Sequence, residues 1–226
     1  KHSTQVRSQE KVDIVISETL GNYALEEHTL ETLQDAKRFL LPNGIMIPGK
    51  LKQIVTPVTS STPLTELESW KNVGHGLTFT AAQEVSLNNL YVRTFTASDL
   101  LQEKGAQKVW DQINFSGKED SLRKKLAKWT LEKQSSISGF CLSWETELVP
   151  GVLLGTHPWN APTHWEQIYL PIQKILTVEA GDEVALNIIS DTRAATGLRI
   201  QWNVEHLRNG KRISAGSMDM QKGLLF

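Results

Sequence analysis

Short apolar runs and one amphipathic stretch organise the first fifty residues. Residues 12–16, Val-Asp-Ile-Val-Ile, are rich in β-branched side chains, as is typical of a strand buried on both faces of a parallel sheet. Leucines at helical spacing then predict a helix from about His28 to Leu40, which Pro42-Asn43-Gly44 should end. A second apolar run covers residues 44–48. The order strand, helix, strand is typical of the end of a doubly wound α/β domain, which we place at residues 1–48.

The pattern then changes to that of an antiparallel β domain. Residues 198–205 alternate apolar and polar side chains, and Asn209-Gly210 after them predicts a tight hairpin turn. Residues 51–58 and 137–144 are also typical of strands. We therefore assign residues 49–226 to an antiparallel, barrel-like domain.

Two helical segments interrupt the predicted strands. A short helix is expected at residues 65–72, within a mixed segment of about 60–88 that interrupts the predicted strands. A second helix is expected around residues 122–129 of a charged segment. The predicted fold class is therefore α+β, with the remnant of a doubly wound α/β domain followed by an antiparallel β-barrel domain that carries a helical arm.

The first predicted strand begins after only about a dozen residues, and these contain no segment that could flank it in a sheet. Parallel strands need neighbouring strands and covering helices. We therefore expect the amino end of this sequence to be a cut surface within a longer protein.

The net charge, the cysteine count and the length of apolar runs indicate which partners and which cellular compartment to expect. The net charge of −1 indicates no overall attraction to nucleic acid or to an anionic membrane. Cys141 is the only cysteine, so a disulfide within the chain is impossible and a reducing, cytoplasmic location is expected. The sequence holds no run of 18 apolar residues, so we expect no membrane-spanning helix.

The candidate chemistry lies in the polar loop after the first strand. Glu18 ends that strand and Glu27 begins the helix nine positions later, while Gly21 between them gives the loop freedom to turn back. Two carboxylates brought together repel one another, so they would need a shared proton, a metal ion or a cationic ligand such as guanidinium. The spacing alone also fits two solvated or helix-capping glutamates. We expect Glu26 to be solvated, and His28 has no partner histidine at a spacing that would hold a metal.

Two motifs resemble those of the protein arginine methyltransferase family. The loop resembles the family's double-glutamate loop, Ser-Glu-Trp-Met-Gly with a second glutamate nine positions after the first. The positions that match are Ser17, Glu18, Gly21 and Glu27, whereas Thr19 and Leu20 replace Trp and Met. Pro162-Thr-His-Trp165 resembles the family's Thr-His-Trp loop, and residues 176–182 resemble the barrel turn that follows it. The resemblance extends over essentially the whole chain and is weakest at about 100–135.

The resemblance implies a role for each matching residue. Glu18 and Glu27 would bind the guanidinium of a substrate arginine and count as catalytic with His164, which would orient the site. Trp165 would wall the arginine pocket, and Tyr23 is assigned to the same pocket. The substrate would be an arginine-containing protein or peptide, and the methyl donor S-adenosylmethionine. Residues of about 60–88 occupy the place of the family's dimerisation arm, so the complete protein would be a homodimer formed through that arm.

The family's glycine-rich donor loop has no counterpart in this sequence, where no Gly-x-Gly-x-Gly occurs. Donor-binding residues are expected to precede Lys1, so the isolated chain should be inactive. Two alternatives stay open. One is a non-catalytic barrel module that binds peptides or mediates assembly. The other is a related methyltransferase with a non-protein substrate, because Thr19 and Leu20 replace residues that shape the family's pocket.

Overall fold

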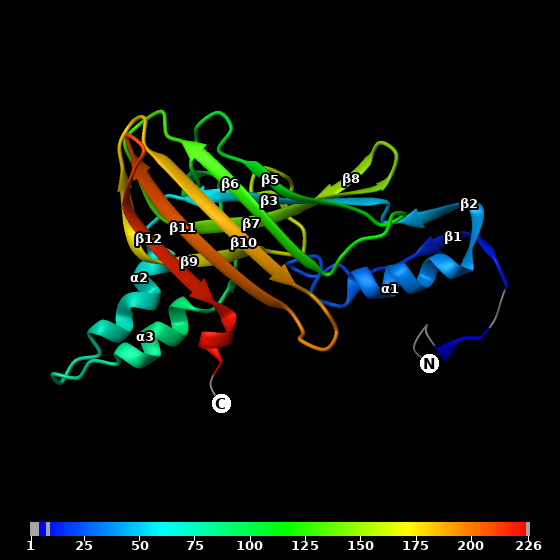
Figure 1. Ribbon diagram of the computed structural model, residues 1–226, viewed down its shortest axis with the longest axis horizontal. Coiled ribbons are helices and arrows are strands. Elements are labelled where there is room, and N and C mark those ends of the chain that lie inside the picture. The colour runs from blue at the N-terminus through cyan, green and yellow to red at the C-terminus, as the bar shows by residue number, and fades with distance from the viewer. Residues whose placement is uncertain (1–4, 8–9, 225–226) are drawn as a thin grey trace.

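The amino-terminal unit is a parallel pair of strands joined by a helix. The computed structural model describes residues 5–7 and 10–224 (Figure 1). In it β1 (Val12–Ile16) lies parallel to β2 (Leu40–Ile47), and α1 (Thr29–Ala36) with the 3-10 turn η2 (Lys37–Phe39) connects them. The predicted order is confirmed. The predicted helix end is wrong, because Pro42-Asn43-Gly44 lies inside β2.

The first strand is not buried on both faces as predicted. Ile14 is 49% and Ile16 72% exposed, and Val12 is also exposed. The physical reason is that β1 and β2 form a two-stranded sheet within the described part of the chain. Val15 of β1 packs against the core, but the strand lacks the layers on both faces that bury a central parallel strand. The apolar composition of β1 therefore indicates a strand suited to a larger sheet.

The β domain contains two antiparallel sheets. The larger has the order β4-β9-β7-β3-β5 with β8 paired to β7, and the smaller has the order β12-β11-β10-β6. The strands of the two sheets together are β3 (Lys50–Val58), β4 (Tyr91–Arg93), β5 (Lys108–Asn114), β6 (Leu122–Thr130), β7 (Ser135–Val149), β8 (Val152–Gly155), β9 (Gln167–Val178), β10 (Glu183–Asp191), β11 (Arg199–Arg208) and β12 (Lys211–Asp219). The strands predicted at 51–58, 137–144 and 198–205 are confirmed.

The two sheets enclose the main core. β5 lies beside β6 and β9 beside β12, so the sheets approach each other at both sides while their hydrogen-bonded ladders stay separate. Trp144 and Phe140 of the larger sheet and Trp202 of the smaller one are fully buried. The Trp202 indole N–H donates to the Pro171 carbonyl at 2.7 Å and so ties one sheet to the other. The predicted barrel thus takes the form of two facing sheets.

The predicted helix at 122–129 is wrong, because this segment is β6. Its residues pair with β10 along their whole length, from Leu122 opposite Asp191 to Thr130 opposite Glu183. Pairing turns Ala127 and Trp129 into the core and leaves the lysines between them and before them in solvent. Apolar side chains at this spacing fit either period, and the neighbouring strand decides between them.

Helices between β3 and β4 form the predicted arm. α2 (Thr62–Glu68), the 3-10 turn η3 (Ser69–Lys71) and α3 (Thr80–Leu87) extend away from the sheets (Figure 1). Two further 3-10 turns are η4 (Ala97–Asp99) and η5 (Met220–Gly223). None of the helices in residues 5–7 and 10–224 is both long and apolar enough to cross a bilayer.

Candidate functional site

The loop between β1 and α1 presents its two predicted carboxylates to solvent. Glu18 follows the end of β1 and Glu27 stands just before α1, and both residues are exposed. Ala24 and His28 adopt positive φ angles of 67° and 56°, which turn the chain sharply before the helix. The loop is therefore a folded structure that carries two solvent-facing glutamates near its ends.

Glu26, which we predicted to be solvated, turns inward instead. Its Oε2 accepts a hydrogen bond from the Tyr23 amide at 2.6 Å. A Cβ atom on Gly21 would overlap the Glu26 carboxylate, so a larger residue here would force that side chain to move. Burial raises the pKa of Glu26, and hydrogen bonds from the loop's backbone amides oppose that rise. Glu26 thus holds the loop's shape from inside, which the prediction missed because unpaired amides of a loop are invisible in a sequence.

Tyr23 also lies beneath the loop, although it was assigned to the substrate pocket. Its side chain is 1% exposed, and its hydroxyl donates to Ser190 Oγ of β10 at 2.8 Å. Gln53 Nε2 of β3 donates to the Tyr23 carbonyl at 2.6 Å. Burial raises the pKa of the Tyr23 hydroxyl, so it stays protonated and able to donate. Tyr23 therefore anchors the loop to both sheets and does not face solvent.

The glutamate loop is joined to the segment that contains the Thr-His-Trp motif. The Glu166 amide donates to Asn22 Oδ1 at 2.8 Å. The Trp144 indole N–H donates to the Gly21 carbonyl at 3.1 Å, and the same indole meets the Trp165 ring edge-on with centroids 5.3 Å apart. Two motifs that are more than 130 residues apart in the sequence thus share one contact region.

His164 and Trp165 form the exposed end of that contact region. The His164 ring lies 3.9 Å from the Trp165 ring, centroid to centroid, and His164 is exposed. Both side chains line a hollow of about 490 Å³ together with Glu166. Glu18 and Glu27 are not among the residues that line this hollow. The structure therefore brings the two loops together through Gly21, Asn22, Trp144 and Trp165, with the candidate carboxylates on the solvent side.

Trp144 and Asn22 are the site residues that sequence reasoning missed. Trp144 lies in β7, in a segment predicted as a strand, where an aromatic side chain is expected to fill the core. A usable signal did exist, because a buried indole N–H requires an acceptor, and a glycine-bearing loop offers free carbonyls. Which carbonyl it finds depends on tertiary contacts alone.

Two acidic side chains and an aromatic pair are the groups of this region that could contact a cation. Glu18 and Glu27 lie on one loop, and each is an acceptor with no neighbouring lysine or arginine in hydrogen-bond contact among the described residues. A planar guanidinium offers five N–H donors, enough to serve two carboxylates at once. The aromatic pair Trp165 and His164 beside the loop supplies flat surfaces that a guanidinium can stack against.

Comparison with known proteins gives consistent matches. The family model described as "PRMT5 oligomerisation domain" matches residues 52–222. "Protein arginine N-methyltransferase 5" of Oryza sativa subsp. indica is 28% identical over 175 residues, which cover 75% of this chain and 25% of the relative. "Histone-arginine methyltransferase CARMER" of Drosophila persimilis is 25% identical over 219 residues, 89% of this chain and 40% of the relative. The chain thus spans less than half the length of these relatives.

Solved structures share the fold. A chain of the "Trypanosoma brucei PRMT1 enzyme-prozyme heterotetrameric complex with AdoHcy" superposes with a TM-score of 0.84 at 23% identity, over 96% of this chain and 70% of that chain. Protein Arginine Methyltransferase 10 of Arabidopsis thaliana gives a TM-score of 0.74 at 17% identity, over 97% of this chain and 73% of that chain. At sequence identities of 23% and 17%, this likeness establishes the fold alone, so the function has to be argued from the residues of this chain.

Proposed function

The chain belongs to the protein arginine N-methyltransferase family, and from this we propose that it carries the arginine-binding side of an S-adenosylmethionine-dependent methyltransferase that acts on protein substrates. The observation that carries the proposal is the contact between the two motif loops. The Glu166 amide donates to Asn22 of the glutamate loop, and Trp144, which donates to the Gly21 carbonyl, packs against Trp165. A fixed contact of this kind is what orientation of a substrate nitrogen requires.

In this proposal Glu18 and Glu27 accept hydrogen bonds from the substrate guanidinium and fix one of its nitrogens in space. The bound cation also relieves the repulsion between the two carboxylates. Trp165 forms a wall of the arginine pocket, and His164 on its face orients the site. Positioning and charge complementarity are the contributions that side chains can make to a direct displacement at a methyl carbon.

The donor site is not built from these residues. The sequence contains no Gly-x-Gly-x-Gly loop, so only the acceptor side of the reaction can be derived from it. S-adenosylmethionine supplies the activated methyl group when it is bound. The exposed isoleucines Ile14, Ile16 and Ile45 of the β1–β2 sheet support the view that further polypeptide packs there and carries the donor site.

The test is methyl transfer by the full-length protein to arginine-containing peptides. We expect Glu18→Gln and Glu27→Gln each to lower kcat/KM about 100-fold or more, because each removes a charge-assisted contact from the guanidinium. Glu183→Gln, at an exposed glutamate on β10, is the matched control and should keep wild-type activity. Wild-type turnover by the Glu18 and Glu27 variants would show that the two carboxylates do not bind the substrate.

A second role, assembly into a homodimer through the arm, has its own support. The matched family model describes an oligomerisation domain. The tip of the arm between α2 and α3 exposes Trp70, Val73, Leu77 and Phe79, and Trp70 meets Phe79 edge-on with centroids 6.3 Å apart. Large apolar side chains gathered on a projecting element are typical of a protein–protein contact.

A further inference from the structure

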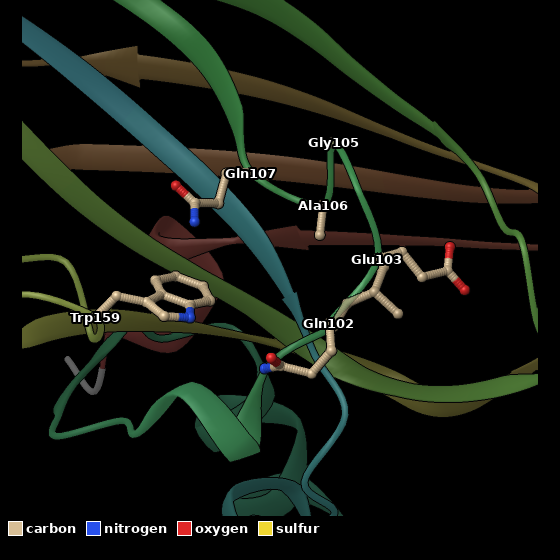
Figure 2. A pocket seen from close by; sticks show the side chains of 7 residues that line it. Gln102, Glu103, Gly105, Ala106, Gln107 and Trp159 are labelled. Carbon is tan, nitrogen blue, oxygen red and sulfur yellow. The ribbon is translucent and has the colours of Figure 1, made fainter.

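The segment between β8 and β9 contributes side chains to two hollows. The hollow of about 490 Å³ begins at His164 and Trp165 and continues past Pro158 and Asn160. A second hollow of about 340 Å³ lies at Trp159, between these residues in the sequence, and faces the loop of residues 101–107 (Figure 2). We name these two hollows together the flank groove. Its inner end is lined by His164 and Trp165, the two side chains that the proposed function also places at the arginine pocket.

The inner part of the flank groove has a mixed apolar and polar lining and carries one carboxylate, that of Glu166. The Thr94 hydroxyl donates to the Glu166 carboxylate, which holds that side chain at the wall of the hollow. Threonine and asparagine side chains supply further hydrogen-bonding groups along the wall. Neither lysine nor arginine lines the hollow among the described residues. Burial lowers the pKa of His157, so this histidine adds no positive charge at neutral pH.

The outer part of the flank groove is dominated by one aromatic side chain. Trp159 is 41% exposed, and Figure 2 shows its indole directed toward the backbone at Gly105 and Ala106, with the Gln107 amide above it. The His157 ring meets it edge-on with centroids 6.3 Å apart, and His157 Nδ1 lies 3.1 Å from Ser143 Oγ. Trp159 is thus held from one side and open on the other. An indole in this position is a surface on which a chain in extended conformation can stack.

We propose that the flank groove binds the residues next to the target arginine in the polypeptide substrate, with a cationic side chain beside Glu166 and a neighbouring residue stacked on Trp159. The inference rests on the proposed function, because it takes the arginine pocket as its starting point. Charge complementarity and continuity with that pocket select an arginine-containing polypeptide as the occupant. Both oxygens of the Glu103 carboxylate, which lines the outer hollow, already accept hydrogen bonds from the amides of Glu132 and Lys133. Lys108 Nζ lies 3.6 Å from where a Cβ on Gly105 would be. The outer hollow is therefore assigned the stacked residue and not the cation.

The experiment compares three peptides in methyl-transfer assays with the full-length protein. One is short and contains the target arginine alone, one carries a flank with a second basic residue, and one has glutamine in place of that residue. We expect Trp159→Ala to lower the ratio of kcat/KM for the long peptide to that for the short peptide about tenfold. Glu166→Gln should lower the ratio of the basic to the glutamine peptide several-fold while its amide still bonds Thr94. Leu153→Ala, at an exposed leucine on β8, is the control and should leave both ratios unchanged.

A second measurement is independent of turnover. The dissociation constant of a fluorescein-labelled long peptide, measured by anisotropy, should rise about tenfold in Trp159→Ala and stay constant in Leu153→Ala. Ratios and dissociation constants that match wild type in both the Trp159 and Glu166 variants would overturn the flank groove. If wild type methylates none of the peptides while the anisotropy shift persists, the proposed function fails and the groove stands as a peptide site.

Discussion

Single residues with buried polar atoms decide how the site is held together. Trp144 is fully buried, yet its indole N–H reaches the Gly21 carbonyl while its ring supports Trp165. Glu26 is tethered in the same way to the Tyr23 amide. Neither side chain faces the proposed substrate. They act by fixing the loop that carries Glu18 and Glu27, so they are positioning residues.

Trp144→Phe tests this role, because phenylalanine keeps an aromatic ring and removes the donor. The Gly21 carbonyl then keeps only the Ala24 amide as its donor, and the lost hydrogen bond should lower the free energy of unfolding by about 1 kcal/mol. Chemical denaturation measures this loss, and methyl-transfer assays on the full-length protein should show a fall in kcat/KM of about tenfold or more.

The matched control is Trp202→Phe. Trp202 is equally buried, and its indole donates to the Pro171 carbonyl at 2.7 Å, away from both motif loops. We expect a similar loss of stability with little change in kcat/KM. Equal losses of activity in the two variants would mean that Trp144 matters only for folding.

At the scale of elements, the turn between β9 and β10 is fastened to β11 by a buried carboxylate. Asp182 accepts from Arg208 Nε at 2.8 Å and from Arg208 Nη2 at 2.7 Å, and its Oδ2 lies 2.7 Å from His206 Nε2. The backbone amide of Glu179 donates to Asp182 Oδ2 at 2.9 Å. Hydrogen bonds from the Arg208 guanidinium are the main reason that the pKa of Asp182 lies far below its usual range.

The pKa shift of Asp182 predicts a pH-dependent stability. Because folding depresses the pKa of this carboxyl, its contribution is present above the unfolded pKa, near 3.9, and is lost as pH falls below that value toward the folded pKa. We expect Asp182→Asn to lower the urea midpoint at pH 7, with the gap from wild type narrowing as pH falls below about 4. Asp120→Asn, at an exposed aspartate, should show no such gap. A difference in urea midpoint between Asp182→Asn and wild type that stays constant down to pH 2 would contradict this role of the Asp182 carboxylate.

At the scale of the whole molecule, two surfaces have apolar side chains that the described residues leave uncovered. One is the β1–β2 sheet with its exposed isoleucines, and the other is the arm tip with Leu77 and Phe79. The surfaces belong to different units, one on the α/β part and one on the helices that extend from the sheets (Figure 1). In the proposed function the first is covered by the donor-binding part and the second by a partner copy.

Leu77→Asp tests the proposed assembly. A carboxylate at the apolar arm tip costs desolvation energy on association, so the dissociation constant of the dimer should rise by at least about tenfold. Light scattering of the full-length protein across a dilution series measures this. Leu153→Asp places the same charge at an exposed leucine on β8 and serves as the control. A Leu77 variant that dimerises like wild type would exclude the arm tip from the interface.

Local sequence patterns were sufficient to predict several of the helices, strands and turns. Period-two alternation predicted the strand that became β11, and Asn209 and Gly210 take the positive φ angles of 50° and 73° that their tight turn requires. The strand, helix and strand of the first unit were likewise predicted from runs of apolar residues. These features depend on neighbours within a few residues, which the sequence contains in full.

Features that depend on distant partners were decided only by the tertiary structure. Residues 122–129 are a strand because β10 offers them a ladder, and β1 is exposed because two strands alone cannot cover one another's faces. Glu26 points inward because its carboxylate accepts a hydrogen bond from the Tyr23 amide, and Tyr23 points inward because its hydroxyl donates to Ser190 Oγ. The sequence, with its family resemblance, predicted which residues could bind a guanidinium, and that assignment stays a prediction. Only the packed structure decided which of them face solvent and which hold the loop, since burial is a property of contacts between segments far apart in the chain.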